Sequence, residues 1–253
     1  MAIKALLFGS LDTLADTHDI QRQAFNEAFR TAGLDWHWEP GTYKRLIARA
    51  NNESRLMEYA AETGKTLDEK TRDTIQRERT LRFGGLLDDM KVELRPGADR
   101  VINVALGSGR KVALVSNAET EMVQAFRAKF GAALGMDEFA FTLDRSSGHA
   151  PKPASDPYDE ALRRLELTPD EAVAIEDTGF GVEGATAASI AALGVPTEWT
   201  NEQDFSGALA VVDQLGTIQH PARSLRVPVA MEDNVVTIDW LEGLMLMEDA
   251  RAA

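Results

Sequence analysis

Residues 172–189, AVAIEDTGFGVEGATAAS, contain the pattern that decides the fold. The apolar run Ala172 to Ile175 ends at two acidic residues, Glu176 and Asp177, and glycines and small residues follow. A short apolar run of this kind predicts a buried strand, and the Ala-rich segment after it predicts a helix. The stretch is therefore expected to form a strand, an acidic turn and a helix that packs back onto the strand.

Two earlier segments repeat this order of strand, polar turn and helix. Residues 3–8 are an apolar run followed by glycine and serine, and residues 111–115 are a second run followed by serine and asparagine. Helical spacing of apolar residues begins near residue 16 after the first run and covers residues 119–130 after the second. Strands that alternate with helices form parallel βαβ units, so the expected fold class is α/β with a doubly wound parallel sheet.

The long segment between the first two strands has helical patterns throughout. An insertion at the carboxyl end of a strand lies at the sheet edge where α/β proteins bind ligands, so we expect it to act as a lid. The predicted organisation is a core of residues 1–15 and 91–253 and an all-helical cap of residues 16–90. We also expect a short strand over residues 235–238, and either a packed terminal helix or a partner surface at residues 244–247.

The composition narrows the class of protein. Among 253 residues, 44% are hydrophobic and 27% charged, as in ordinary soluble proteins. A net charge of −14 opposes unassisted binding to nucleic acid or to anionic membranes. The lack of cysteine excludes disulfides and thiolate chemistry. No apolar stretch approaches the ~20 residues of a membrane span, and the first residues lack a cleavage signature, so we expect a cytoplasmic protein.

Four motifs in the right order resemble the haloacid dehalogenase superfamily. The most similar group is that of β-phosphoglucomutase and phosphoglycolate phosphatase, which carries a helical cap after the first strand. The resemblance covers about residues 3–195 and implies a Rossmannoid core with an inserted cap. The four stretches are FGSLDTLADT (8–17), RPGADRVINVALGSGRKVALVSNAE (95–119), PKPASDPYDEAL (151–162) and IEDTGFGVEGATAAS (175–189).

The first motif departs from the family pattern. Active relatives carry Asp-x-Asp-Gly-Thr-Leu, in which the first Asp forms an aspartyl-phosphate and the second donates and accepts the leaving-group proton. The matching run here is GSLDTL at residues 9–14. Gly9 therefore stands at the nucleophile position and Leu11 at the acid/base position, and neither has a group for that chemistry.

Neighbouring polar residues are the candidates to replace the missing nucleophile. Asp12 is the first of these, although aspartate is also favoured in tight turns and helix caps, and we favour that structural role. Ser10 is expected to point to the face opposite Gly9, and no histidine is placed to activate it. Asp16 is expected at the start of a helix or at a hinge.

The phosphate-binding positions of the family are kept. The resemblance implies that Ser116, Asn117 and Lys152 hold phosphate, in keeping with an anion site at the start of a helix. Two other roles stay open. Ser116 and Asn117 are good helix N-caps, and Lys152 is equally suited to pair with Glu176 or Asp177 and serve only the fold.

Glu176 and Asp177 match the acidic pair of the family magnesium site. That site also uses the nucleophile carboxylate and a backbone carbonyl, here that of Leu11, so the loss of a carboxylate at Gly9 predicts weakened Mg²⁺ binding. Otherwise no cofactor is expected. Alternatively, the acidic pair caps the following helix. The histidines show no metal-ligand spacing in the sequence: His18, His37, His149 and His220.

Two function classes follow from these residues. The favoured one is a catalytically impaired pseudoenzyme that binds a small phosphorylated metabolite or a protein partner. The alternative is a Mg-dependent phosphohydrolase of small phosphorylated metabolites with an atypical mechanism. Loss of a nucleophile costs about 10⁶ in rate in a well-studied hydrolase, which is why the first class is favoured on sequence alone.

Overall fold

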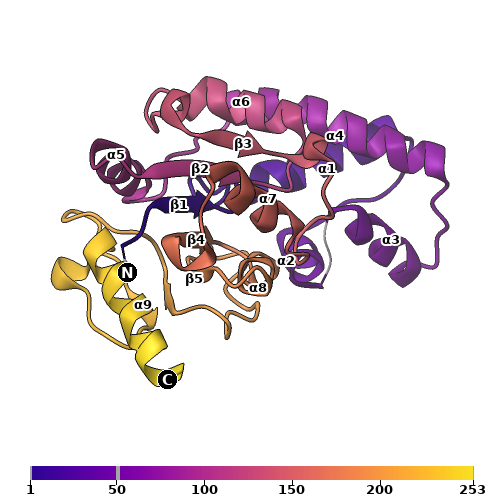
Figure 1. Ribbon diagram of the computed structural model, residues 1–253. Helices are drawn as coiled ribbons and strands as arrows, with labels where there is room; N and C mark the ends of the chain where they lie inside the picture. Colours follow the sequence, from indigo (N-terminus) through magenta and orange to yellow (C-terminus); the bar gives the residue numbers. More distant parts are fainter. Residues whose placement is uncertain (1, 50–51, 253) are drawn as a thin grey trace.

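The computed structural model describes residues 2–49 and 52–252, and their seven strands form one sheet (Figure 1). The strand order is β3-β2-β1-β4-β5-β6-β7, and all neighbouring strands are parallel except β6 and β7. This confirms the expected doubly wound α/β fold. The strands are β1 (Ala5–Phe8), β2 (Lys111–Val115), β3 (Phe141–Leu143), β4 (Ala172–Glu176), β5 (Ala191–Gly194), β6 (Ala210–Val212) and β7 (Ser224–Arg226).

Helices α1 to α5 separate β1 from β2 in the chain, helices α6, α7 and α8 connect the strands from β2 to β5, and α9 follows the last strand (Figure 1). Their bounds are α1 (His18–Thr31), α2 (Pro40–Arg49), α3 (Asn52–Glu62), α4 (Glu69–Asp89), α5 (Ala98–Gly107), α6 (Thr120–Phe130), α7 (Asp156–Leu165), α8 (Gly179–Ala187) and α9 (Ile238–Ala252). Short 3₁₀ turns are η1 (Met136–Glu138), η2 (Arg145–Ser147), η3 (Pro169–Glu171) and η4 (Glu232–Asn234).

Strand β1 lies in the middle of the sheet and is buried on both faces. It pairs with β2 on one side and β4 on the other, and all four of its residues are inaccessible to solvent. Leu6 and Phe8 pack in one hydrophobic cluster, whereas Ala5 and Leu7 pack in the cluster on the other face. A strand covered by helices on both faces needs a continuous apolar run, which is why the sequence ALLF forms it.

The helical insertion has an aromatic interior of its own. Phe25, Phe29, Trp36, Trp38 and Tyr43 pack together there with ring centroids 4.6–6.5 Å apart. Within the described residues, one isolated antiparallel bridge joins Ala15 to Leu94, where the two chain segments between this lobe and the sheet lie side by side.

The later half of α4 belongs with the sheet rather than with the aromatic interior. Its Phe83 and Leu87 pack in the main hydrophobic cluster. The helical lobe therefore shares one long helix with the core, and the division at residues 15 and 90 remains a prediction.

The C-terminal segment differs in one respect from expectation. The strand expected over residues 235–238 is wrong: Val236 makes one bond to Leu215 across the chain, and α9 begins at Ile238. One backbone–backbone bond does not make a strand ladder, and the Val236 carbonyl instead accepts from the Arg100 side chain. Helix α9 lies beside the N-terminus (Figure 1), with Met245 buried and Met247 partly exposed. No helix in the described ranges is both long and apolar enough to cross a bilayer.

Candidate active site

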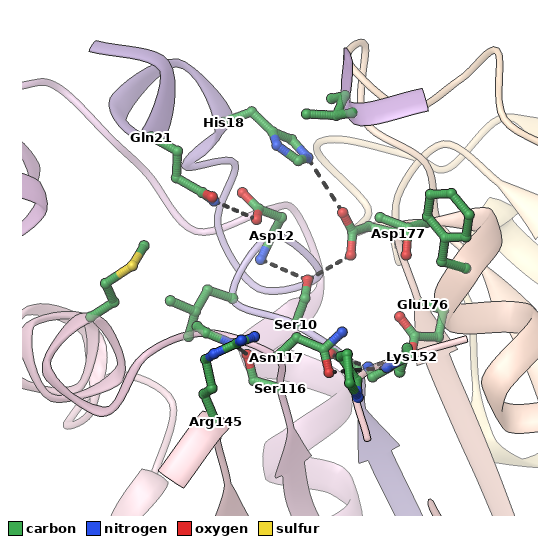
Figure 2. A pocket seen from close by; sticks show the side chains of 18 of the residues that line it. Ser10, Asp12, His18, Gln21, Ser116, Asn117, Arg145, Lys152, Glu176 and Asp177 are labelled. Carbon is green, nitrogen blue, oxygen red and sulfur yellow. Dashed lines mark hydrogen bonds and ion pairs between the residues drawn. The ribbon is translucent and has the colours of Figure 1, made fainter. Parts of the chain in front are cut away.

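The residues selected from the sequence meet at the carboxyl ends of β1, β2 and β4, where they line one crevice (Figure 2). Its volume is about 110 Å³, several times the ~10–15 Å³ that one water needs in this measure. Ser116, Asn117, Lys152, Glu176 and Asp177 all border it, together with the altered first motif. Parallel strands end at one edge of the sheet, so four distant motifs converge at this place.

The carboxyl group of Glu176 fills the space beside Gly9. A Cβ atom placed on Gly9 would lie 2.0 Å from Cδ and Oε1 of Glu176 and 2.1 Å from its Oε2. A Cβ on Gly181 would lie 2.0 Å from Glu176 Oε2. Two glycines therefore make room for one buried carboxyl group, and a carboxyl group stands beside position 9 although that residue has none.

Lys152 ties this carboxyl group to the first strand. Its Nζ donates to Glu176 Oε1 over 2.7 Å and also to the Gly9 carbonyl, and it is only 5% exposed. The Tyr158 hydroxyl donates to the same Oε1. Burial raises the pKa of Glu176, and the charge of Lys152 acts against that rise. The ion pair considered from the sequence is thus present, with Glu176 rather than Asp177 as the partner.

The loop that follows β2 carries Ser116 and Asn117, and both residues line the crevice. Ser116 Oγ accepts the Ala118 backbone N–H over 3.0 Å, and the hydroxyl keeps its own hydrogen as a donor. Asn117 Oδ1 accepts the Lys152 N–H over 3.3 Å, so its side-chain NH₂ group faces away from that contact. The N-cap alternative for these two residues is wrong, because the N-cap position of α6 is Glu119.

Asp177 is fully buried and bonded to the first motif. Its Oδ1 accepts from the Ser10 hydroxyl over 2.5 Å, and its Oδ2 lies 3.4 Å from His18 Nε2 (Figure 2). Burial alone would raise the pKa of Asp177, but His18 and the Ser10 hydroxyl hold it below its usual value. The expectation that Ser10 points away from the site is wrong, since the strand geometry ends at Phe8 and a turn follows.

The alternative of a helix cap for the acidic pair is also wrong. The N-cap of α8 is Thr178, whose hydroxyl accepts the Gly181 N–H over 3.0 Å. Glu176 and Asp177 are thereby left to face the crevice.

Asp12 holds the start of α1. Its Oδ1 accepts from the backbone N–H and the hydroxyl of Thr17 over 2.7 and 2.8 Å, and its Oδ2 accepts from Gln21 over 3.0 Å. These three bonds agree with the structural role favoured from the sequence. Asp12 nevertheless borders the crevice, and burial raises its pKa.

Asp16 and His18 complete a cluster that the sequence analysis missed. Each offers an atom within 4.8 Å of the other and of Asp12. Burial raises the pKa of Asp16 to about 6. Burial alone would lower the pKa of His18, but the surrounding carboxylates raise it above its usual value. The i, i+4 and i+6 spacing crosses a turn into a helix, so no strand or helix periodicity brings these residues together.

The donor set is compatible with a divalent cation. Oδ2 of Asp177 and Oε2 of Glu176 are buried and make no hydrogen bond within the described residues. Oxygen atoms of this kind are the ligands that magnesium prefers. The family carboxylate of residue 9 is absent, so a cation here would depend on Asp177 and on backbone oxygen.

The fold, the crevice and the order of its motifs are those of a hydrolase class with a Rossmannoid core and a helical insertion after the first strand. A family model for haloacid dehalogenase-like hydrolases matches residues 3–189, and the chain belongs to this family.

Individual relatives agree with this assignment. The plasmid-encoded protein CbbY of Cupriavidus necator is 34% identical over 227 residues, which cover 87% of this chain and 88% of that protein. CbbY of Cereibacter sphaeroides is 31% identical, with 90% and 100% of the two chains covered.

Solved structures have the same overall fold. CbbY from Rhodobacter sphaeroides in complex with phosphate has a TM-score of 0.77 and 30% identity, covering 84% of this chain and 94% of that one. A CbbY variant from the same source, in complex with xylulose-(1,5)bisphosphate, gives the same values. β-Phosphoglucomutase of Clostridium difficile, with a TM-score of 0.72 and 16% identity over 98% and 99% of the chains, shows the fold alone.

Proposed function

We propose that this protein hydrolyses a phosphate ester of a small sugar-like metabolite, with a divalent cation and without an aspartyl-phosphate at position 9. The observation that carries the proposal is the buried carboxyl group of Glu176, which lies beside Gly9 and contacts Lys152. CbbY relatives, one of them in complex with a sugar bisphosphate, support the choice of substrate class. They favour the hydrolase alternative over the pseudoenzyme that sequence reasoning preferred.

The phosphate group would bind between two loops. Lys152 supplies the positive charge, and the Ser116 hydroxyl and the Asn117 amide donate hydrogen bonds. Arg55 and Arg145 also line the crevice and add charge for a second phosphate. In a protein of net charge −14, such a local positive site is needed to attract an anionic substrate.

The proposed chemistry replaces the covalent step by attack of water. The water oxygen bonds to phosphorus as the ester bond breaks, and its proton passes to the Glu176 carboxylate, whose pKa is raised by burial. A divalent cation held through Asp177 would neutralise charge on the phosphate oxygens. Leu11 offers no proton, so the leaving oxygen takes its proton from solvent.

Phosphate release from a panel of sugar mono- and bisphosphates, with Mg²⁺ or Mn²⁺, tests the proposal. We expect slow release that Lys152→Met and Asp177→Asn each abolish. Release at the same rate in both variants would locate the activity elsewhere and would contradict the proposal.

A second candidate is binding without turnover. It is favoured by one observation, the absence of any side-chain carboxylate or proton donor at Gly9 and Leu11. In that case sugar phosphates raise the melting temperature of the protein, Lys152→Met removes the rise, and no phosphate is released.

A further inference from the structure

We propose that Asp12, Asp16 and His18 form a binding site for one divalent first-row transition ion, at the point where the chain leaves the sheet for the helical lobe. The three residues are not the acidic pair Glu176 and Asp177. The site does not depend on the proposed hydrolysis, because a cation can bind there without substrate.

The spacing of the ligand atoms fits a metal ion. One atom of each side chain lies within 4.8 Å of the other two. Ligands at ~2.0–2.2 Å from a common ion are at most ~4.4 Å apart, so shifts of a few tenths of an ångström bring the three together. Asp12 and His18 are 6% and 5% exposed, so water competes little for them.

The imidazole of His18 is the observation that points to a ligand. Nδ1 is buried and makes no hydrogen bond within the described residues, and the buried Nε2 has only the ion-pair contact with Asp177. Tyr43 and Trp199 hold the ring from two sides, with ring centroids 6.4 and 6.3 Å away. Asp177 Oδ2 lies 3.4 Å from Nε2, in the way that carboxylates orient metal-binding histidines.

The charges around the imidazole are unbalanced. Three carboxylates, those of Asp12, Asp16 and Asp177, surround one ring that carries at most one positive charge. The guanidinium of Arg95 interacts with the same three carboxylates through its charge, while its hydrogen bonds go to four backbone carbonyls, including that of Asp12, so one negative charge more than the positive charges remains. Buried charges need compensation, and a dication supplies two charges at this place.

The bonds of Asp12 leave it able to coordinate. Thr17 and Gln21 donate to its oxygens and fix their direction, and each carboxylate oxygen has a second lone pair. A mixed set of carboxylate oxygen and imidazole nitrogen favours Mn²⁺, Fe²⁺, Co²⁺ or Zn²⁺ over Mg²⁺.

Binding of Co²⁺ to the chelator-treated full chain tests the site, with calorimetry for stoichiometry and visible absorption for nitrogen coordination. We expect one ion per chain whose binding depends on this cluster, and at least a tenfold loss of its affinity in His18→Gln and in Asp16→Asn. The matched control is His37→Gln, an exposed histidine that pairs with Glu39 outside the cluster and should bind as the parent does.

Circular dichroism confirms that each variant is folded. Absence of Co²⁺ binding to the parent chain would overturn the site. So would binding that survives both His18→Gln and Asp16→Asn but is lost in Glu176→Gln, because the ion would then lie at the acidic pair. No substrate is present, so the result is independent of phosphate release.

Discussion

The Glu176 carboxyl group occupies the space into which a side chain at position 9 would project, with 2.0 Å between its Cδ and a Cβ built on Gly9. The two residues are therefore coupled: a side chain at position 9 requires the Glu176 carboxyl group to move from its buried position. Restoring the family residue at position 9 therefore restores the family site only if Glu176 is displaced.

Gly9→Ala is expected to destabilise the fold by about 1–3 kcal/mol, because the added methyl overlaps a buried carboxyl group. Gly9→Ala combined with Glu176→Ala should be less destabilised than the sum of the two single changes. Urea unfolding of the four proteins measures this coupling. Strict additivity would mean that the two side-chain positions do not compete for space.

Simple repair of the first motif should fail for the same reason. Gly9→Asp with Leu11→Asp restores both family carboxylates in the sequence. We expect this double variant to be inactive and destabilised, because Glu176 fills the space beside position 9, whereas adding Glu176→Gly should regain stability and raise phosphate release. An active, stable double variant would show that Glu176 moves aside without cost.

Variants of the ion pair between Lys152 and Glu176 should distinguish an effect on stability from an effect on phosphate binding. Lys152→Met leaves a buried carboxylate without its cation and should cost about 3–5 kcal/mol. Lys152→Met with Glu176→Gln removes both charges and should recover most of that loss. Thermal denaturation with and without inorganic phosphate checks both effects: the phosphate-dependent rise in melting temperature should stay absent in the double variant. If the phosphate-dependent rise in melting temperature returned in the double variant, Lys152 would have no part in phosphate binding.

The presence of Leu11 at the acid/base position predicts a preference for substrates whose leaving group needs no proton. A general acid contributes roughly 10²–10⁴-fold when the leaving group is poor. With no acid at this position, an aryl phosphate, whose leaving oxygen needs no proton, should be hydrolysed at least about 100-fold faster than a sugar phosphate. Initial rates for p-nitrophenyl phosphate and a hexose phosphate measure the ratio. Equal rates would point to a proton donor supplied from the helical lobe.

Most strands that form the candidate site, and the polar residues that follow them, were predictable because each strand is marked by an apolar run in its own sequence. Apolar runs such as residues 111–115 mark their own strand, and β2 has those bounds. Ser116, Lys152 and Asp177 were found because each follows such a strand or lies in a recognisable loop. Strands β5 to β7 were missed: β7 is exposed along its length, and β5 and β6 are short runs of small residues.

The site itself depends on contacts that no local pattern carries. The place of Glu176 beside Gly9 results from the packing of β1 against β4, a separation of 167 residues along the chain. Nothing in the sequence indicated that His18 lies beside Asp12 and Asp16, because a turn separates the three residues and no helical or strand period relates them. In both cases the decisive information is three-dimensional.

The central claim is that water, with Glu176 as proton acceptor, replaces the aspartyl-phosphate route. Phosphate release by the parent chain and by Glu176→Gln, measured with a divalent cation on the same phosphorylated substrates, tests it most directly. The account predicts slow release by the parent, a loss of at least about 100-fold in Glu176→Gln, and an unchanged melting-temperature rise with inorganic phosphate in both proteins. Equal release by the two proteins, or no release by the folded parent while phosphate still binds, would contradict it.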